Sequence, residues 1–214
     1  MIRAFDIIFS FVALLFLSPI FCLIIICLRF SGEGEIFFTQ ERVGRDGKLF
    51  RLYKFATMLK NSPDIGTGTI TIHNDPRILP FGRLLRKTKV NELPQLWNVL
   101  VGDMSIIGPR PQTRDCFNDF DLLSQKMIVK VRPGLSGIGS IIFINEEAML
   151  GDNLKAKEIY VNTIMPFKGA VERWFVERSG LRLYFFLIFL TIYVLFSGNR
   201  DVLWKLFPDL PIKR

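Results

Sequence analysis

The chain has 214 residues, of which 50% are hydrophobic, and its 28 Lys and Arg against 20 Asp and Glu give a formal net charge of +8. The high apolar content excludes a disordered chain, and three cysteines with a single histidine exclude a disulfide framework or a structural zinc site. The excess of Phe (21) over Tyr (4) and Trp (3) indicates contact with lipid.

The first element is an uncharged apolar run over residues 7–28. As a helix it would reach roughly 33 Å, enough to cross a bilayer core, and it is too long for a secretory signal. Ser18-Pro19 near its middle predicts a kink, and the Ser18 hydroxyl is a candidate partner for the carbonyl that the proline frees. A kinked single span and a re-entrant hairpin fit these residues equally well. The basic residues that follow the run place the bulk of the chain in the cytoplasm.

Two strands and a short helix are predicted next. Residues 36–40 and 49–55 are strand-like, and Asp46-Gly47 between them is a strong hairpin signal. Residues 81–89 form a basic helix. A second helix follows, because Leu93, Leu96, Trp97 and Leu100 share one helical face. Asn91 is its predicted N-cap, and Gly102-Asp103 ends it.

The remaining elements are a short extended segment at 105–108 and helices at 113–130, 146–163 and 167–178. A final apolar run over residues 183–196 would reach about 21 Å, which is short for a full crossing. It suits an interfacial helix, and it could serve a homodimer contact as readily as lipid. The pattern predicts a mixed, helix-rich α+β protein with an N-terminal membrane helix, a small cytoplasmic domain and interfacial helices.

The candidate chemistry lies in arginines and carboxylates near turns. Arg110 stands between two prolines and Arg132 precedes Pro133-Gly134, an arrangement suited to bidentate contact with phosphate oxygens. Attraction to an anionic lipid bilayer explains the same basic surface equally well. No nucleic-acid-binding pattern is present in the sequence. Glu92 and Asp103 flank the second helix, and either could hold Mg²⁺ together with substrate phosphates.

Several segments, taken in order, carry a resemblance to a known family. They are LSPI, FFTQERVGRDGKLFRLYKF, DPRILPFGRLLRKTKVNELPQLWNVLVGDMSIIGPRP and KVRPGLSG, between about Phe5 and Gly137. The chain resembles the bacterial sugar transferases, the monotopic phosphoglycosyl transferases that start undecaprenyl-linked glycan assembly.

The resemblance implies a reaction and a topology. A sugar-1-phosphate would pass from a UDP-sugar to undecaprenyl phosphate with release of UMP, on the cytoplasmic face of the bacterial inner membrane, in exopolysaccharide or lipopolysaccharide biosynthesis. In this family the membrane helix is re-entrant and breaks at the Ser-Pro pair, which favours the hairpin interpretation here. The chain then divides into a re-entrant helix (1–30), a catalytic domain (31–180) and an apolar interfacial helix with a tail (181–214). Family members use Mg²⁺.

The resemblance also implies site residues. The family has an Asp-Glu pair whose Asp attacks the β-phosphate, and Arg86, Arg110 and Arg132 fall in its basic motifs, which implies phosphate or nucleotide contacts. The sequence departs from the family at the nucleophile, because Asn91 stands where the Asp is expected. Three explanations remain open: Glu92 has taken over the attack, the protein is a catalytically silent ligand-binding or scaffold member, or the amide is a trapping substitution. We expect an active enzyme centred on Glu92.

Overall fold

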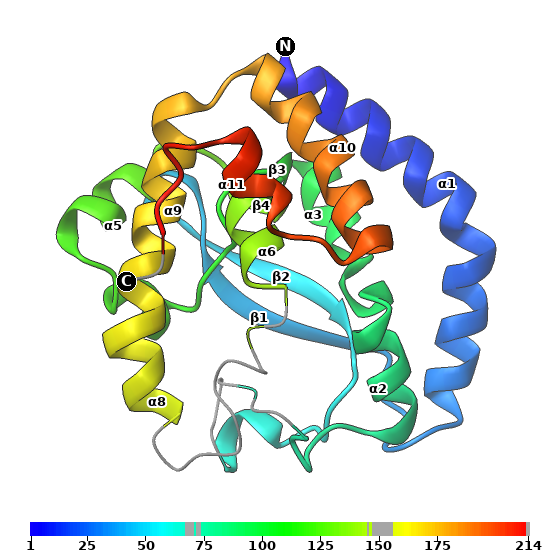
Figure 1. Cartoon of the computed structure of the whole chain (residues 1–214). Coiled ribbons are helices and arrows are strands. Elements are labelled where there is room, and N and C mark those ends of the chain that lie inside the picture. Colours follow the sequence, from blue (N-terminus) through cyan, green and yellow to red (C-terminus); the bar gives the residue numbers. More distant parts are fainter. Residues whose placement is uncertain (67–70, 72–73, 145, 147–155, 213–214) are drawn as a thin grey trace.

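The computed structural model describes residues 1–66, 71, 74–144, 146 and 156–212 (Figure 1). Its α-helices are α1 (Ile2–Arg29), α2 (Pro80–Lys87), α3 (Gln95–Val101), α4 (Arg114–Asn118), α5 (Leu122–Ile128), α6 (Ile138–Ile142), α8 (Ala156–Ile159), α9 (Met165–Arg178), α10 (Leu181–Ser197) and α11 (Val202–Leu206). Its strands are β1 (Phe37–Val43), β2 (Leu49–Phe55), β3 (Ser105–Ile107) and β4 (Gly134–Ser136). The predicted helix-rich α+β class is confirmed.

Helix α1 lies along one side of the molecule and bends near its middle (Figure 1). Pro19 lies inside this helix, which continues from Ile2 to Arg29. The Ser18 hydroxyl donates a hydrogen bond of 2.7 Å to the Leu15 carbonyl. This is the carbonyl that a backbone N–H at position 19 would otherwise satisfy, so the predicted role of Ser18 is confirmed.

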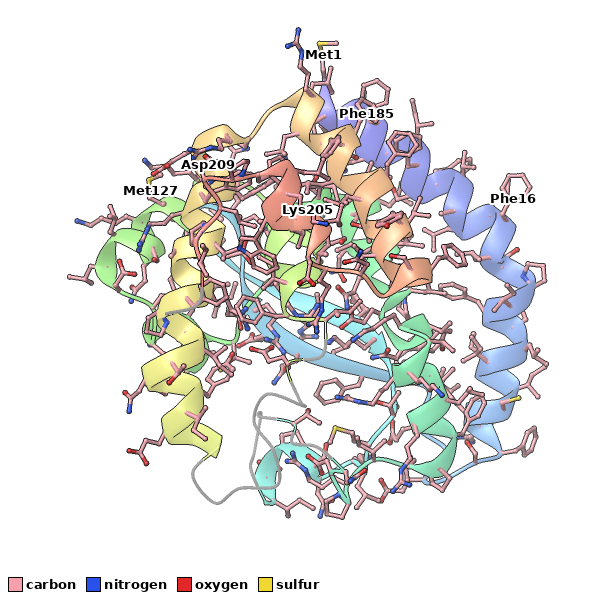
Figure 2. All side chains as sticks on the ribbon, in the orientation of Figure 1. Met1, Phe16, Met127, Phe185, Lys205 and Asp209 are labelled. Atoms are coloured by element: carbon pink, nitrogen blue, oxygen red, sulfur yellow. The ribbon has the colours of Figure 1, made fainter. Side chains whose placement is uncertain are left out.

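Much of α1 faces outward. In its most apolar 18-residue window only 11% of the residues are buried, and by length and composition the helix could cross a membrane. Phe16 is 77% exposed and points away from the rest of the chain (Figure 2). The core helix of a water-soluble protein would bury such side chains, so this surface suits lipid.

Both ends of α1 nevertheless contact the same domain. At the N-terminal end, Arg3 donates to the carbonyls of Val99 and Leu100 near the end of α3. At the other end, a small core cluster joins α1 to β2 and α2 through Ile24, Leu28, Phe55 and Leu85. The helix therefore leaves the domain and returns to it.

The β-hairpin forms as the sequence predicts. Strands β1 and β2 pair antiparallel from Phe37↔Phe55 to Val43↔Leu49. The connecting turn places Asp46 and Gly47 at positive φ, the conformation that Asp-Gly favours in hairpins. The predicted extended segment at 105–108 is also present, as β3, which pairs in parallel with β4.

The predicted N-cap of α3 is wrong. Asn91 lies within a 3-10 turn over Val90–Glu92, and α3 begins only at Gln95. Pro94 starts the helix instead, since proline lacks an N–H and its fixed φ suits the first helical turn. The Asn91 side chain therefore does not cap α3.

The predicted single helix over 113–130 is also wrong, because two short helices replace it. Asp121 accepts a hydrogen bond from the Ser124 N–H and caps α5, and Phe120 is buried in the preceding turn. The predicted helix over 146–163 lies partly outside the described residues. Its described end comprises α8 and a π-helical turn over Tyr160–Ile164 that leads into α9.

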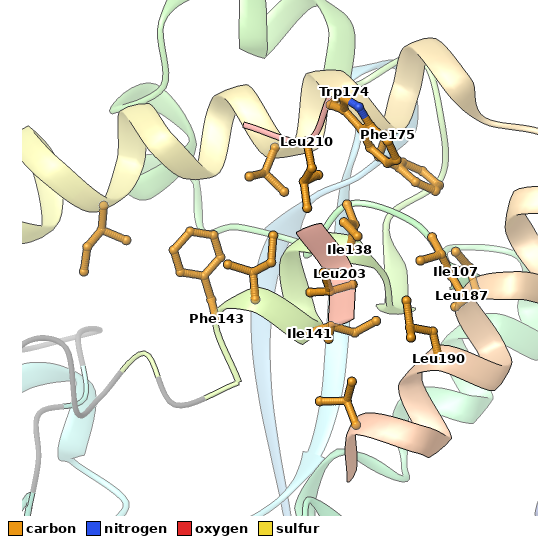
Figure 3. Close-up of a cluster of buried hydrophobic side chains, with 14 of the residues drawn as sticks. Ile107, Ile138, Ile141, Phe143, Trp174, Phe175, Leu187, Leu190, Leu203 and Leu210 are labelled. Atoms are coloured by element: carbon orange, nitrogen blue, oxygen red, sulfur yellow. The ribbon is translucent and has the colours of Figure 1, made fainter. Parts of the chain in front are cut away.

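The main core is a cluster of buried side chains that come mostly from α6, α9, α10 and α11 (Figure 3). It includes Ile107 and Ile138 from the region before residue 181, together with Leu187, Leu203 and Leu210 after it. One face of the final apolar helix thus packs inside the domain. Its opposite face remains exposed, for example at Phe189 and Phe196.

Candidate active site

The centre of the site is the carboxylate of Glu92, in the 3-10 turn before α3. Its Oε1 atom lies 3.1 Å from Lys54 Nζ and 2.7 Å from a terminal nitrogen of Arg110. Lys54 comes from β2, and Arg110 from the Pro-flanked loop after β3. Only 14% of the Glu92 side chain is exposed, so three distant segments enclose one anion between two cations.

These cations decide the charge on Glu92. Burial by itself raises the pKa of a carboxyl group, but Arg110 and Lys54 outweigh it and hold the pKa of Glu92 well below its ordinary value. Burial lowers the pKa of Lys54 to about 8, although Glu92 opposes this change. Glu92 is therefore ionised at neutral pH.

Arg110 is held at its backbone as well as at its side chain. Its backbone N–H donates to Glu172 Oε1 at 3.2 Å, while its guanidinium contacts Glu92. Glu172 comes from α9 and is 1% exposed. A Cβ atom on Gly139 would lie 2.2 Å from the same Glu172 oxygen, so a side chain at this position would displace the carboxyl group from its place beside Arg110.

Glu172 also has an unusual protonation equilibrium. Burial raises its pKa from 4.5 to about 7, although the Arg110 N–H and Lys168 partly oppose the change. Its Oε2 atom is buried and has no hydrogen-bond partner in the described part of the chain. A protonated carboxyl group suits this environment better than a carboxylate.

A cavity of about 150 Å³ adjoins this cluster through Lys54 and Asn91, whereas Glu92 and Arg110 are not part of its lining. Its lining includes the side chains of Arg42, Lys54, Arg86 and Asn91. Two buried atoms of these residues, Asn91 Oδ1 and Arg42 Nε, have no hydrogen-bond partner among the described residues. The unsatisfied Arg42 N–H and the several cations around the cavity suit a ligand with anionic oxygens, whereas Asn91 Oδ1 needs a donor or a cation.

The structure brings some of the predicted residues together and separates others. Glu92 and Arg110 are in contact, and Asn91 and Arg86 line the adjoining cavity. Arg132 lies elsewhere, where its Nε–H donates to the Gly102 carbonyl at 2.9 Å.

The structure does not bring Asp103 to Glu92. Asp103 accepts a hydrogen bond from the Asn98 side chain, beyond the far end of α3. A seven-residue helix is about 10 Å long, whereas Mg²⁺ binds oxygens at roughly 2.1 Å. The two carboxylates therefore cannot share one ion, because the helix holds them apart.

Sequence reasoning missed Lys54, Arg42 and Glu172 as site residues. Lys54 and Arg42 belong to strand patterns whose charged residues suggest only solvent exposure. Glu172 follows Lys168 at a helical spacing of four, which is typical of a surface ion pair. Lys168 and Glu172 are instead each only 1% exposed. Nothing in the sequence indicates this burial, so Glu172 could not be identified as a site residue.

An apolar helix seated on an α+β domain, with a buried carboxylate near a cation-lined cavity, is typical of a membrane-associated protein. The family model described as "Bacterial sugar transferase" matches residues 1–198, and the chain therefore belongs to the bacterial sugar transferase family.

The chain is similar to several named proteins. It is 35% identical over 153 residues to the exopolysaccharide production protein ExoY of Rhizobium meliloti, an alignment that covers 65% of this chain and 67% of ExoY. It is 38% identical over 143 residues to the UDP-glucose:undecaprenyl-phosphate glucose-1-phosphate transferase of Escherichia coli, covering 65% of this chain and 30% of the relative. An undecaprenyl-phosphate N-acetylgalactosaminephosphotransferase of Aeromonas hydrophila is 36% identical over 142 residues, covering 65% of this chain and 33% of the relative. The chain thus matches about a third of these last two proteins.

Proposed function

We propose that the chain, a phosphoglycosyl transferase, transfers a sugar-1-phosphate from a UDP-sugar to undecaprenyl phosphate and releases UMP. The observation that carries this proposal is the ionised Glu92, held by Lys54 and Arg110, because Lys54 and the adjoining Asn91 also line a cavity with further cations. Relatives named as undecaprenyl-phosphate sugar phosphotransferases support the same reaction class. By this proposal the product enters polysaccharide assembly.

The cations suit the diphosphate of the donor. Lys54 and Arg110 can exchange the Glu92 oxygen for phosphate oxygens, while Arg42 and Arg86 lie in the cavity lining within reach of the same ligand. In this proposal Lys54 and Arg110 remain beside Glu92 while they contact the phosphate, so their charge still keeps the carboxylate ionised. These half-buried guanidinium and ammonium groups then stabilise the charge on the moving phosphoryl group.

Glu92 is the proposed nucleophile. One of its oxygens forms a bond to the β-phosphorus, and the bond from that phosphorus to the bridging oxygen breaks, so UMP leaves with the electron pair. An oxygen of undecaprenyl phosphate then attacks the same phosphorus and releases the Glu92 carboxylate. Covalent catalysis divides a transfer between two anions into two displacements. Asn91, at the position of the family's aspartate, contributes a neutral amide oxygen to the cavity.

Mg²⁺ is the proposed cofactor. The described residues hold no group of three or more His, Cys, Asp or Glu that could bind a metal ion on their own. One carboxylate from Glu92 and the unsatisfied Asn91 Oδ1 instead fit an ion whose other ligands are substrate phosphates and water. When bound, Mg²⁺ would neutralise phosphate charge. Asp103 has no part in this ligand set.

A re-entrant α1 is the proposed topology. A single domain contacts both ends of the helix, and its charged surface cannot lie on two sides of a bilayer. The bend at Pro19 lets the apolar middle enter the lipid and return to the same leaflet. The basic residues after the helix favour the cytoplasmic face of the inner membrane. A homodimer through the exposed face of α10 stays a prediction.

Release of UMP tests the reaction. The full chain in native membranes is incubated with Mg²⁺, undecaprenyl phosphate and a panel of UDP-hexoses and UDP-N-acetylhexosamines. We expect UMP release from at least one donor, and only when undecaprenyl phosphate can accept the sugar phosphate over repeated turnovers. Binding of UDP-sugars without any release would contradict the proposal and support the catalytically silent alternative.

A further inference from the structure

A second cavity, of about 230 Å³, lies where the start of α1 meets β3 and the start of α10. Four cationic residues line it: Arg3, Arg45, Lys130 and Arg132. They come from α1, the hairpin turn and the segment before β4, so only the fold brings them together. The sequence singled out Arg132 as an anion-binding residue, and the structure places it here instead of beside Glu92.

Asp6 is the carboxylate in the lining of this cavity, and protein donors already engage it. Its Oδ1 accepts hydrogen bonds from the Ser105 hydroxyl at 3.0 Å, the Ile106 N–H at 3.0 Å and the Tyr184 hydroxyl at 2.8 Å. These contacts fix α1 to β3 and α10. The carboxylate is therefore committed to structure and forms no ion pair with the four cations in the described part of the chain.

The cations keep donors available for a ligand. Arg132 uses its Nε–H for the Gly102 carbonyl, and its terminal nitrogens have no acceptor within the described ranges. Lys130 Nζ contacts the Met127 sulfur at 3.4 Å and meets no carboxylate of the described residues. Among the described residues, Arg45 has only an exposed ion pair with its neighbour Asp46, at 3.8 Å. Several unpaired charges of one sign around a cavity favour an anion.

The position of the cavity indicates which anion. Ile2, at the start of the apolar helix, lines it, as does Gly180, directly before the second apolar helix. The two helices begin side by side there, near the N-terminus (Figure 1), and Phe5 packs against Phe185 at 4.9 Å between ring centroids. Exposed apolar side chains such as Phe9 and Phe189 continue from this point along both helices. An anion with an apolar tail would thus place its charge among the cations and its tail beside the two apolar helices.

We propose that this cavity binds the phosphodiester headgroup of an anionic membrane phospholipid. The phosphodiester, which carries one negative charge, offsets part of the positive charge of Arg45, Lys130 and Arg132 and fixes the N-terminal end of α1 at the bilayer surface. The site is separate from the Glu92 cavity and requires no sugar nucleotide, so a failure of the proposed transfer reaction leaves it standing.

Native mass spectrometry of the detergent-solubilised full chain tests the site, with phosphatidylglycerol and phosphatidylcholine as probes. We expect one phosphatidylglycerol to be retained in preference to phosphatidylcholine. The double variant Arg45→Gln, Lys130→Gln should lose about tenfold in phosphatidylglycerol affinity, since each basic group near an anionic headgroup adds to binding. Both residues are exposed, so the variant should fold, and thermal unfolding verifies this.

The matched control is Arg114→Gln, Lys205→Gln, which removes the same charge from exposed positions on α4 and α11. It should retain phosphatidylglycerol like the native chain. An equal loss in this control would show general charge attraction and overturn the proposal. Equal retention of phosphatidylcholine would also overturn it, and displacement of the lipid by an equal concentration of inorganic phosphate would identify a soluble-anion site instead.

Discussion

At the residue scale, the site depends on one ionised carboxylate and a neutral neighbour. Glu92 stays ionised because Lys54 and Arg110 outweigh the effect of burial on its pKa. Asn91 precedes it and presents a buried amide oxygen with no partner among the described residues. The pair therefore combines an anion that can attack phosphorus with a neutral amide that can serve only as a weaker ligand for a cation.

Substitution of each member of this pair should separate their roles. Glu92→Gln keeps the shape but removes the charge, so we expect UMP release to fall to background. Asn91→Asp restores the family's carboxylate and should raise turnover. Steady-state UMP release measures both, with Glu41→Gln, an exposed carboxylate on β1, as the control. Unchanged turnover in Glu92→Gln would remove Glu92 from the mechanism.

A pH dependence of stability should arise from Glu172. Its pKa rises from 4.5 to about 7 on folding, so the folded chain keeps a proton that the unfolded chain loses between these values. Stability therefore falls as pH rises through this window, by about 3 kcal/mol once pH exceeds 7. Glu172→Gln retains an oxygen for the Arg110 N–H and should give a flatter melting temperature between about pH 5 and 8.

Thermal unfolding in detergent across that pH range measures the effect. Glu177→Gln, an exposed position on the same helix, should keep the native pH profile. If Glu172→Gln and the native chain show the same slope, Glu172 does not bind the proton.

At the element scale, α2 depends on close contact with the chain after β2. A Cβ atom on Gly82 would lie 2.2 Å from the Thr57 carbonyl oxygen, and that oxygen also accepts the Leu79 N–H at 3.0 Å. The contact lets α2 place Arg86 in the cavity lining. A side chain at this position would force the helix away from the site.

We expect Gly82→Ala to destabilise the chain by roughly 1–3 kcal/mol, because overpacking at a backbone contact cannot relax easily. Leu84→Ala on the same helix is the control, since Leu84 is 55% exposed and its loss leaves no cavity. Melting temperatures of the two variants provide the comparison. Equal melting temperatures would show that α2 moves without strain.

At the scale of the whole molecule, a bent apolar helix begins and ends on one domain. Asp6 joins its first turns to β3 and α10, while Leu28 packs against the opposite end of the domain beside Phe55. A helix that crossed the bilayer would separate these two attachments by the full membrane thickness. The packing therefore favours entry and exit through one leaflet.

Cysteine labelling in cells measures this topology. The native Cys22, Cys27 and Cys116 are replaced by serine, and one cysteine is inserted after Met1 or introduced as Lys48→Cys in the hairpin turn. We expect both cysteines to react with an impermeant maleimide only after the inner membrane is opened. Labelling of the N-terminal cysteine alone in intact spheroplasts would establish a single span.

The sequence alone determined the features that depend on local pattern. The length of the apolar run, the Ser18-Pro19 break, the Asp46-Gly47 hairpin and the motif around Glu92 could all be read from neighbouring residues. The tertiary structure decided which side chains meet. Lys54 and Glu92 are 38 residues apart, and Arg110 and Glu172 are 62 apart. Such contacts depend on how helices and strands pack, and burial sets the protonation of the groups involved. Arg132 and Asp103 show the same point, since their motif positions suggested one site and the length of α3 placed them elsewhere.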